Sequence, residues 1–150
     1  MRWTVSLHRV GEGFRRDSED HLDWFFEHNS EQNDDETSGA LITFASDLSP
    51  TVRPSKSGII IVPVDRLPDH RHIYLDYQGE LSGNRGQITP ILSGQFRWGS
   101  SGTEDKSSVA IELVTIEIRD HSLAAMVRLA DSWRAMLCSA PCVPLRLGPL

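Results

Sequence analysis

Residues 59–64 read Ile59-Ile60-Ile61-Val62-Pro63-Val64 and form the longest apolar run in the chain. β-branched residues dominate this run, and a short continuous apolar run is typical of a strand that is buried on both faces. A membrane-spanning helix needs about 20 consecutive apolar residues. Because the longest apolar run covers only residues 59–64, the sequence predicts no such helix. The sequence therefore predicts a buried strand here, and the neighbouring segments decide what surrounds it.

Segments of similar composition lie on both sides of this run. Each is short, and turn-forming residues separate them, most clearly at Gly83-Asn84-Arg85-Gly86. Many short strands with few helical patterns favour a mainly-β fold, a compact closed or nearly closed β-barrel of antiparallel strands, because closure removes exposed strand edges. The predicted strands cover residues 4–8, 21–28, 40–45, 59–64, 72–78, 87–92, 94–98 and 109–119.

Length and composition indicate one ordinary globular domain. The chain has 150 residues, of which 39% are hydrophobic and 24% are charged. Such a chain can bury a core without a metal or a disulfide. We expect a domain at residues 1–138 and a C-terminal tail at residues 139–150, where two prolines and a glycine within residues 143–150 predict little regular structure.

The cysteines and the N-terminal residues bear on the location of the protein. Cys138 and Cys142 have no second pair that would complete a zinc site, so we expect reduced thiols rather than a disulfide. Charged residues recur within residues 1–9, so this segment lacks the uninterrupted apolar stretch of a signal peptide. Both observations favour a cytoplasmic protein.

Charge is distributed unevenly along the chain. Nine of the 21 acidic residues lie within residues 17–36, which contain no Lys or Arg. The rest of the chain has 12 acidic residues and 15 Lys and Arg, so its net charge is +3. The formal charge of −6 therefore conceals a mildly basic remainder. Residues 29–39 have the composition of a solvated loop.

Residues 122–137 allow two interpretations. Their alanines, leucines and methionines are good helix formers, so local propensity favours a helix. Asp120-His121 and Asp131-Ser132 are plausible turn pairs at the spacing of a strand meander, which favours strands. Local pattern alone leaves both open.

Histidines and an aspartate supply the candidate chemistry. Side chains at i and i+2 of a strand point to the same face, so His21 and Asp23 can bind one ion together. His8 on a neighbouring strand would complete a two-His, one-carboxylate set, which suits Mn, Fe or Zn. The spacing taken alone is more typical of a solvated histidine or a structural hydrogen bond than of a metal site.

Residues 69–86 carry a longer pattern: Asp69-His70, then Tyr74-x-x-Tyr77-x-Gly79, then Gly83-x-x-Gly86. This pattern resembles the 3′-phosphoesterase domain of bacterial DNA ligase D. The family's other hallmark, an early His followed by H-[YW]-D and a Glu, corresponds to His8, His21-Leu22-Asp23 and Glu27, with Leu22 in place of the aromatic residue. The resemblance covers roughly residues 4–138.

The resemblance implies a β-barrel, with strands rather than a helix in residues 122–137. It also implies a metal-dependent hydrolase with a manganese-type site, which removes a 3′-terminal ribonucleotide remnant or phosphate from a primer strand during DNA end repair. His8, His21 and Asp23 would hold the metal, and His70 would contact the scissile phosphate and act as the catalytic residue. The implied partners are nucleic-acid 3′ ends, in primer-template DNA or RNA–DNA, and DNA repair proteins.

Two departures from the family pattern bear on activity. The two metal histidines are about twice as far apart as in the family, which predicts an insertion at residues 11–20. Phe25 stands where the family has an arginine that clamps phosphate, and it shares the face of His21 and Asp23 if the segment is a strand. Phe25 is then expected to line the cavity, although it reads equally well as core packing.

Two functions follow from these departures. The first is a phosphoesterase of normal or reduced activity, in which Arg71 and Arg85 bind substrate in place of the missing arginine, with Arg53 and Lys56 as further candidates. The second is a catalytically inactive barrel that binds nucleic acid or a protein.

Overall fold

The computed structural model describes residues 1–13, 19–28, 40–49, 53–54, 59–99, 109–126 and 143–148. Most of these residues lie in strands. Two short helices accompany them, the 3₁₀ helix η1 (His72–Leu75) and α1 (His121–Met126). The strands are β1 (Arg2–Val10), β2 (His21–Phe26), β3 (Ala40–Asp47), β4 (Arg53–Pro54), β5 (Ile60–Val62), β6 (Asp65–Arg71), β7 (Gly79–Leu81), β8 (Gly86–Trp98), β9 (Val109–Ile118) and β10 (Val143–Leu147).

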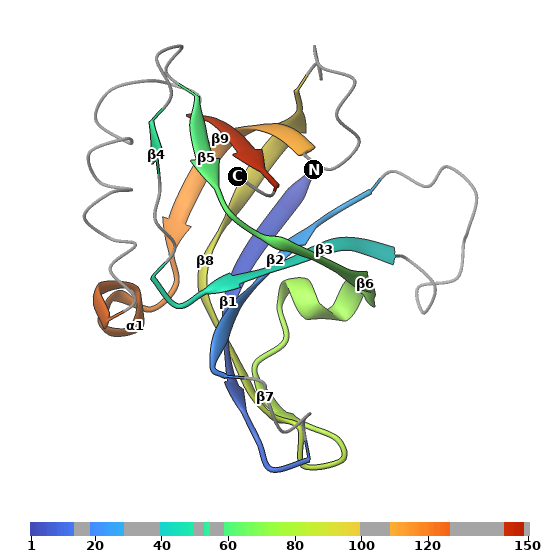
Figure 1. Cartoon of the computed structure of the whole chain (residues 1–150). Coiled ribbons are helices and arrows are strands. Elements are labelled where there is room, and N and C mark those ends of the chain that lie inside the picture. Colours follow the sequence, from blue (N-terminus) through green and yellow to red (C-terminus); the bar gives the residue numbers. More distant parts are fainter. Residues whose placement is uncertain are drawn as a thin grey trace.

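The strands of the described segments form one sheet in the order β4-β5-β10-β9-β8-β1-β2-β3-β6, and β7 pairs with β8. The sheet curls into a half-barrel (Figure 1), which confirms the predicted mainly-β, barrel-like fold. It is not closed, because β4 and β6 form its two edges. Both edge strands contain a proline, Pro54 and Pro68, which cannot donate to a strand ladder and is therefore tolerated at an edge.

Strands β1 and β2 sort their side chains onto two faces. One face joins the larger core cluster and contributes Trp3, Val5, Leu7, Leu22, Trp24 and Phe26. The antiparallel register sets Ser6 opposite Asp23 and His8 opposite His21, so the alternate residues of both strands share the other face. On that face Phe25 packs into a second, smaller cluster with Leu41, Tyr74, Leu75 and Ile88.

Helix η1 replaces the strand predicted at residues 72–78, so that prediction is wrong. Tyr74 and Leu75 are both buried, whereas neighbouring residues of a strand would point to opposite faces. The Asp76 N–H donates to the Ile73 carbonyl at 3.2 Å and completes the turn. The Thr4 hydroxyl donates to the Leu75 carbonyl at 2.8 Å and ties η1 to β1.

Two further strand boundaries differ from the predictions. Residues 87–92 and 94–98 belong to one continuous strand, β8, whose pairing with β9 shifts register between Gln95 and Phe96. Strand β6 was not predicted, because Pro68 and several charged residues interrupt any apolar alternation there.

The strands expected at residues 122–137 are wrong for the first part of that segment, which is helical in α1. Asp120 caps this helix, because its carboxylate accepts from the Leu123 N–H and its carbonyl accepts from the Ala124 N–H, each at 2.9 Å. Residues 127–137 lie outside the described residues. Neither described helix has the length and apolar character needed to cross a membrane.

The C-terminal segment also departs from its prediction. The prolines and glycine of residues 143–150 predict little regular structure there, but Val143–Leu147 forms β10, which lies between β5 and β9 and pairs with both. Leu145 and Leu147 are buried in the larger core cluster, which explains why the segment is ordered despite its prolines. Cys138, Cys142 and the acidic segment at residues 29–39 lie outside the described residues.

Gly94 of β8 is a position where the fold requires the absence of a side chain. A Cβ built there would lie 1.9 Å from the Thr115 carbonyl oxygen, which also accepts a hydrogen bond from the Trp3 indole at 3.2 Å. We predict that Gly94→Ala lowers the free energy of unfolding by about 1–3 kcal/mol, measured by denaturant titration. The matched change Gln95→Ala, at an exposed neighbour, should stay within about 0.5 kcal/mol; equal effects of the two would contradict the prediction.

Candidate metal centre

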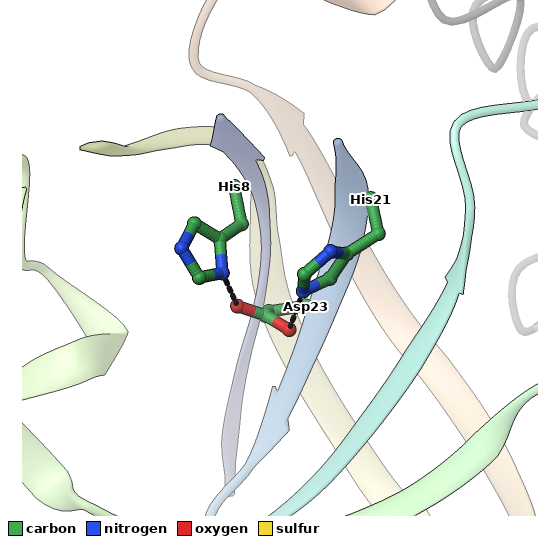
Figure 2. Close-up of side chains that lie close together, drawn as sticks. All are labelled: His8, His21 and Asp23. Atoms are coloured by element: carbon green, nitrogen blue, oxygen red, sulfur yellow. Dashed lines mark ion pairs between the residues drawn. The ribbon is translucent and has the colours of Figure 1, made fainter. Parts of the chain in front are cut away.

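The structure brings His8, His21 and Asp23 together, as the sequence analysis expected. Each offers one ligand atom, and these atoms lie within 4.8 Å of one another. Figure 2 shows the two imidazoles, from adjacent strands β1 and β2, directed at opposite oxygens of the Asp23 carboxylate. The register of β1 and β2 produces this arrangement, because it sets His8 opposite His21 and leaves Asp23 two residues further along the same face.

The Asp23 carboxylate lies equally far from both rings. Its Oδ2 is 3.3 Å from His8 Nδ1, and its Oδ1 is 3.3 Å from His21 Nε2. One ligand atom from each of the three side chains lies within 4.8 Å of the others, which is close enough for them to hold a single ion. His8 and Asp23 are each 3% exposed, and His21 is only partly covered. The centre is therefore closed on the side of β1 and more open at His21.

In each histidine, the outer ring nitrogen, which is the one that does not face Asp23, determines the tautomer. His8 Nε2 lies 3.1 Å from the Arg85 carbonyl oxygen, and His21 Nδ1 lies 2.7 Å from the Glu19 carbonyl oxygen. A carbonyl only accepts hydrogen bonds, so the ring nitrogen facing it carries the proton. In the neutral rings, the nitrogens that face Asp23 then hold lone pairs. Histidines that bind metals show this pattern, with the outer N–H on a carbonyl and the lone pair on the ion.

Lone pairs that face a carboxylate require a positive charge between them. Either each ring takes up a second proton, or a cation lies among the three side chains. Two buried polar atoms nearby, Asp23 Oδ1 and Ser6 Oγ, have no hydrogen-bond partner among the described residues. Leaving such atoms unsatisfied costs about 1–3 kcal/mol each, which a bound ion and its water would relieve. The donor set, the tautomers and these two atoms therefore fit a divalent metal.

Contacts within the cluster shift the pKa values of His21 and Asp23. Burial alone lowers the pKa of His21, but the contact with the negatively charged Asp23 carboxylate, together with the Glu19 carbonyl, outweighs burial, so the pKa of His21 is raised. Burial alone raises the pKa of Asp23, yet its contacts with His21 and His8 outweigh burial and lower it. Without metal, the pair thus favours a charged aspartate beside a protonated His21.

The raised pKa of His21 predicts how the stability of the metal-free protein depends on pH. The contribution of His21 is fully present below its unfolded value of 6.5 and is lost as the pH rises through its higher folded pKa. With chelator present, the unfolding free energy of the wild type should fall more than that of His21→Gln as the pH rises above 6.5. Identical profiles in denaturant titrations would show that His21 and Asp23 are not coupled.

The lowered pKa of Asp23 acts in the acidic range. Its contribution to stability is present above its ordinary value of 3.8 and is lost as the pH falls through its lower folded pKa.

His70 lies on β6 and contacts Phe25, which is two residues from Asp23 in β2. Its ring contacts the rings of Phe25 and Tyr74 edge-on, with centroids 5.7 Å and 5.5 Å away. Nδ1 lies 2.8 Å from the Pro68 carbonyl oxygen and therefore donates to it, which leaves Nε2 to meet a ligand. The structure thus places His70 against Phe25 and does not bring it into the three-residue cluster.

Two of the proposed substrate-binding arginines border a surface hollow. The guanidinium of Arg71 lies 5.8 Å from the centre of the Tyr74 ring, and that of Arg85 donates to Ser82 within the turn. Both residues are exposed, and both line the hollow. Lys56 and the side chain of Arg53 lie outside the described part of the structure.

Phe25 shares the face of His21 and Asp23, as its position in the strand predicted, but it does not line the hollow. It is fully buried and stacks on Tyr74 with ring centroids 5.7 Å apart. The structure therefore supports the core-packing interpretation of Phe25. The arginine that the family pattern has at this position would point into an apolar cluster here.

We predict that Phe25→Arg disrupts the fold instead of restoring a phosphate clamp, because it buries a charge among apolar side chains. Phe25→Ala should cost about 3–5 kcal/mol in denaturant titrations. Ile73→Ala removes an apolar side chain that is 56% exposed and should change stability by less than about 0.5 kcal/mol. A folded Phe25→Arg protein with wild-type stability and higher phosphate affinity would restore the cavity-lining interpretation.

Sequence reasoning missed three supports of the centre. Ser6 lies two residues before His8, so the period of a strand was the signal that places it on the same face. The carbonyls of Glu19 and Arg85, which orient the rings, carry no side-chain signal at all. A scan of the chain against protein-family models found no match, and neither did a search of curated proteins.

Proposed function

We propose that this chain is a metal-dependent phosphoesterase-like protein that acts on the 3′ ends of nucleic acid in DNA end repair. The observation that carries this proposal is the convergence of His8, His21 and Asp23, with the ring nitrogens that point away from Asp23 held by backbone carbonyls. The resemblance of residues 69–86 to the phosphoesterase domain of DNA ligase D supplies the substrate class. A cytoplasmic location and DNA repair proteins as partners belong to the same proposal.

The ligand set narrows the choice of metal. Two imidazoles and one carboxylate suit Mn, Fe or Zn with positions open to substrate, and the resemblance favours Mn. When bound, such an ion polarises a phosphoryl oxygen and lowers the pKa of a bound water. The chain's own part is to hold the three ligand atoms within 4.8 Å and to fix both tautomers through backbone carbonyls.

Three further side chains would act on the phosphate. His70 has Nδ1 committed to the Pro68 carbonyl, so its Nε2 is the atom that would contact the scissile phosphate or protonate the leaving oxygen. Arg71 and Arg85 are exposed, line the hollow and would supply the positive charge that the family pattern assigns to the position of Phe25.

A specific observation favours a second candidate, a catalytically inactive barrel that binds nucleic acid or a protein. Phe25 is buried in the smaller cluster, so the phosphate clamp of the family pattern is absent at that position. Binding needs only the exposed arginines, whereas turnover needs the clamp or its replacement.

We predict one Mn²⁺ per chain by calorimetry and release of phosphate from a 3′-phosphorylated oligonucleotide that depends on this metal. Asp23→Asn should weaken Mn²⁺ binding by about a hundredfold or more, because it removes the only anionic ligand among the three. His70→Ala should lower the rate by about a hundredfold or more with the fold intact.

Matched controls separate these effects from general loss of charge or of a histidine. Glu117→Gln on β9 and His121→Ala on α1 alter exposed residues outside the centre and should leave both measurements unchanged. Mn²⁺ binding without phosphate release would favour the inactive barrel. No Mn²⁺ binding by the wild type would refute both the metal site and the phosphoesterase.

A further inference from the structure

The hollow beside the candidate centre has a volume of about 780 Å³ and is bordered by η1, β7 and the turn at residues 82–85. Three arginines line it, Arg9, Arg71 and Arg85, against one acid, Glu80. The chain as a whole carries a formal charge of −6, so this basic lining runs against its overall charge. A concave, positively lined surface concentrates anions.

The hollow also presents apolar and aromatic surface. Tyr74 and Tyr77 line it with ring centroids 5.7 Å apart, and the Tyr77 hydroxyl donates to the Glu80 carbonyl, which fixes the orientation of its ring. Ile73 lines it as well and is 56% exposed, one of two large apolar residues exposed to this degree among the described residues. Arginines interspersed with flat apolar side chains form the surface that binds single-stranded nucleic acid, where phosphates meet the cations and bases stack on the rings.

One contact connects this hollow to the candidate centre, and a second connects it to His70. The carbonyl of Arg85 accepts from His8, so the turn that borders the hollow also orients a metal ligand. Tyr74 lines the hollow and contacts the ring of His70. A strand that lies in the hollow would therefore end next to the residues proposed for chemistry.

We propose that this hollow binds the terminal nucleotides of a single-stranded nucleic acid, with Arg9, Arg71 and Arg85 on its phosphates and Tyr77 and Ile73 against its bases. The inference rests on the proposed function for its substrate class, and it assigns the surface that holds the strand. A hollow of this volume lies in the range of sites for small ligands, so it accepts a short segment of one strand.

Binding is measured with the full chain in chelator, by fluorescence anisotropy of a labelled single-stranded DNA of about ten nucleotides over a series of salt concentrations. Arg71→Gln and Arg9→Gln should each weaken binding and reduce the slope of log K against log salt by about 0.7. The control is Arg97→Gln, which removes the same charge eleven residues along β8 from Gly86 and should leave the slope unchanged.

Base stacking is tested at Tyr77. Tyr77→Leu should weaken binding by about tenfold. Tyr77→Phe keeps the aromatic ring and should retain most of the wild-type affinity. Ile73→Gln provides a second test at an exposed position where folding is not at risk, and it should weaken binding severalfold.

Several outcomes would overturn the inference. These are no binding by the wild type, equal binding by Arg71→Gln and wild type, no effect of Tyr77→Leu and Ile73→Gln, or equally tight binding of poly-glutamate, which would indicate an acidic protein as partner. Preference for duplex over single strand would also overturn it. Because these binding measurements are made in chelator, they do not depend on whether the protein is a metal-dependent phosphoesterase. Phosphate release by the wild type, together with unchanged DNA binding in every hollow variant, would refute the binding role of the hollow but not the proposed function.

Discussion

The antiparallel pairing of β1 with β2 is the constraint on which the core and the candidate centre both depend. In this register Trp3 faces the same way as Phe26, and His8 faces the same way as His21, on opposite sides of the sheet. A slip of one residue would send the tryptophans to the polar face and separate the three ligand atoms. Packing of the larger cluster therefore holds the register, and the register holds the centre.

The sequence predicted those parts of the structure that depend on local periodicity. His21 and Asp23 share a face because they are two residues apart, and the turn at residues 83–86 follows from glycine and asparagine at positive φ. The placement of His8 on a strand next to His21 was a hypothesis that the family resemblance also implied, since residues 11–20 separate the two strands and no spacing rule spans them.

The wrong predictions concern residues whose conformation depends on distant contacts. Residues 72–75 alternate like a strand, yet the Thr4 hydroxyl and the apolar cluster around Phe25 hold them as a 3₁₀ turn. Leu145 and Leu147 are too few to predict a strand among prolines, but β5 and β9 flank them in the sheet. The role of Phe25 as packing was equally open until its neighbours were known.

The turn at residues 82–85 shows why the support of a site can be invisible in sequence. Its Gly83 and Asn84 adopt φ of 75° and 53°, and Gly86 approaches the Arg9 carbonyl so closely that a Cβ would lie 1.9 Å away. The resulting backbone path presents the Arg85 carbonyl to His8. Because the acceptor is a backbone carbonyl, the hydrogen bond to His8 depends on the shape of the turn and not on the side chain of Arg85.

The position of β10 in the sheet affects how the chain folds during synthesis. Strand β5 ends at Val62 and β10 begins at Val143, so 80 residues are made between β5 and its parallel neighbour. In the described sheet only β10 joins β4 and β5 to the remaining strands. Pairings at such large sequence separation form slowly because a long loop must close first. The exposed edges of β5 and β9 in a nascent chain are therefore the surfaces on which a chaperone or a second copy can act.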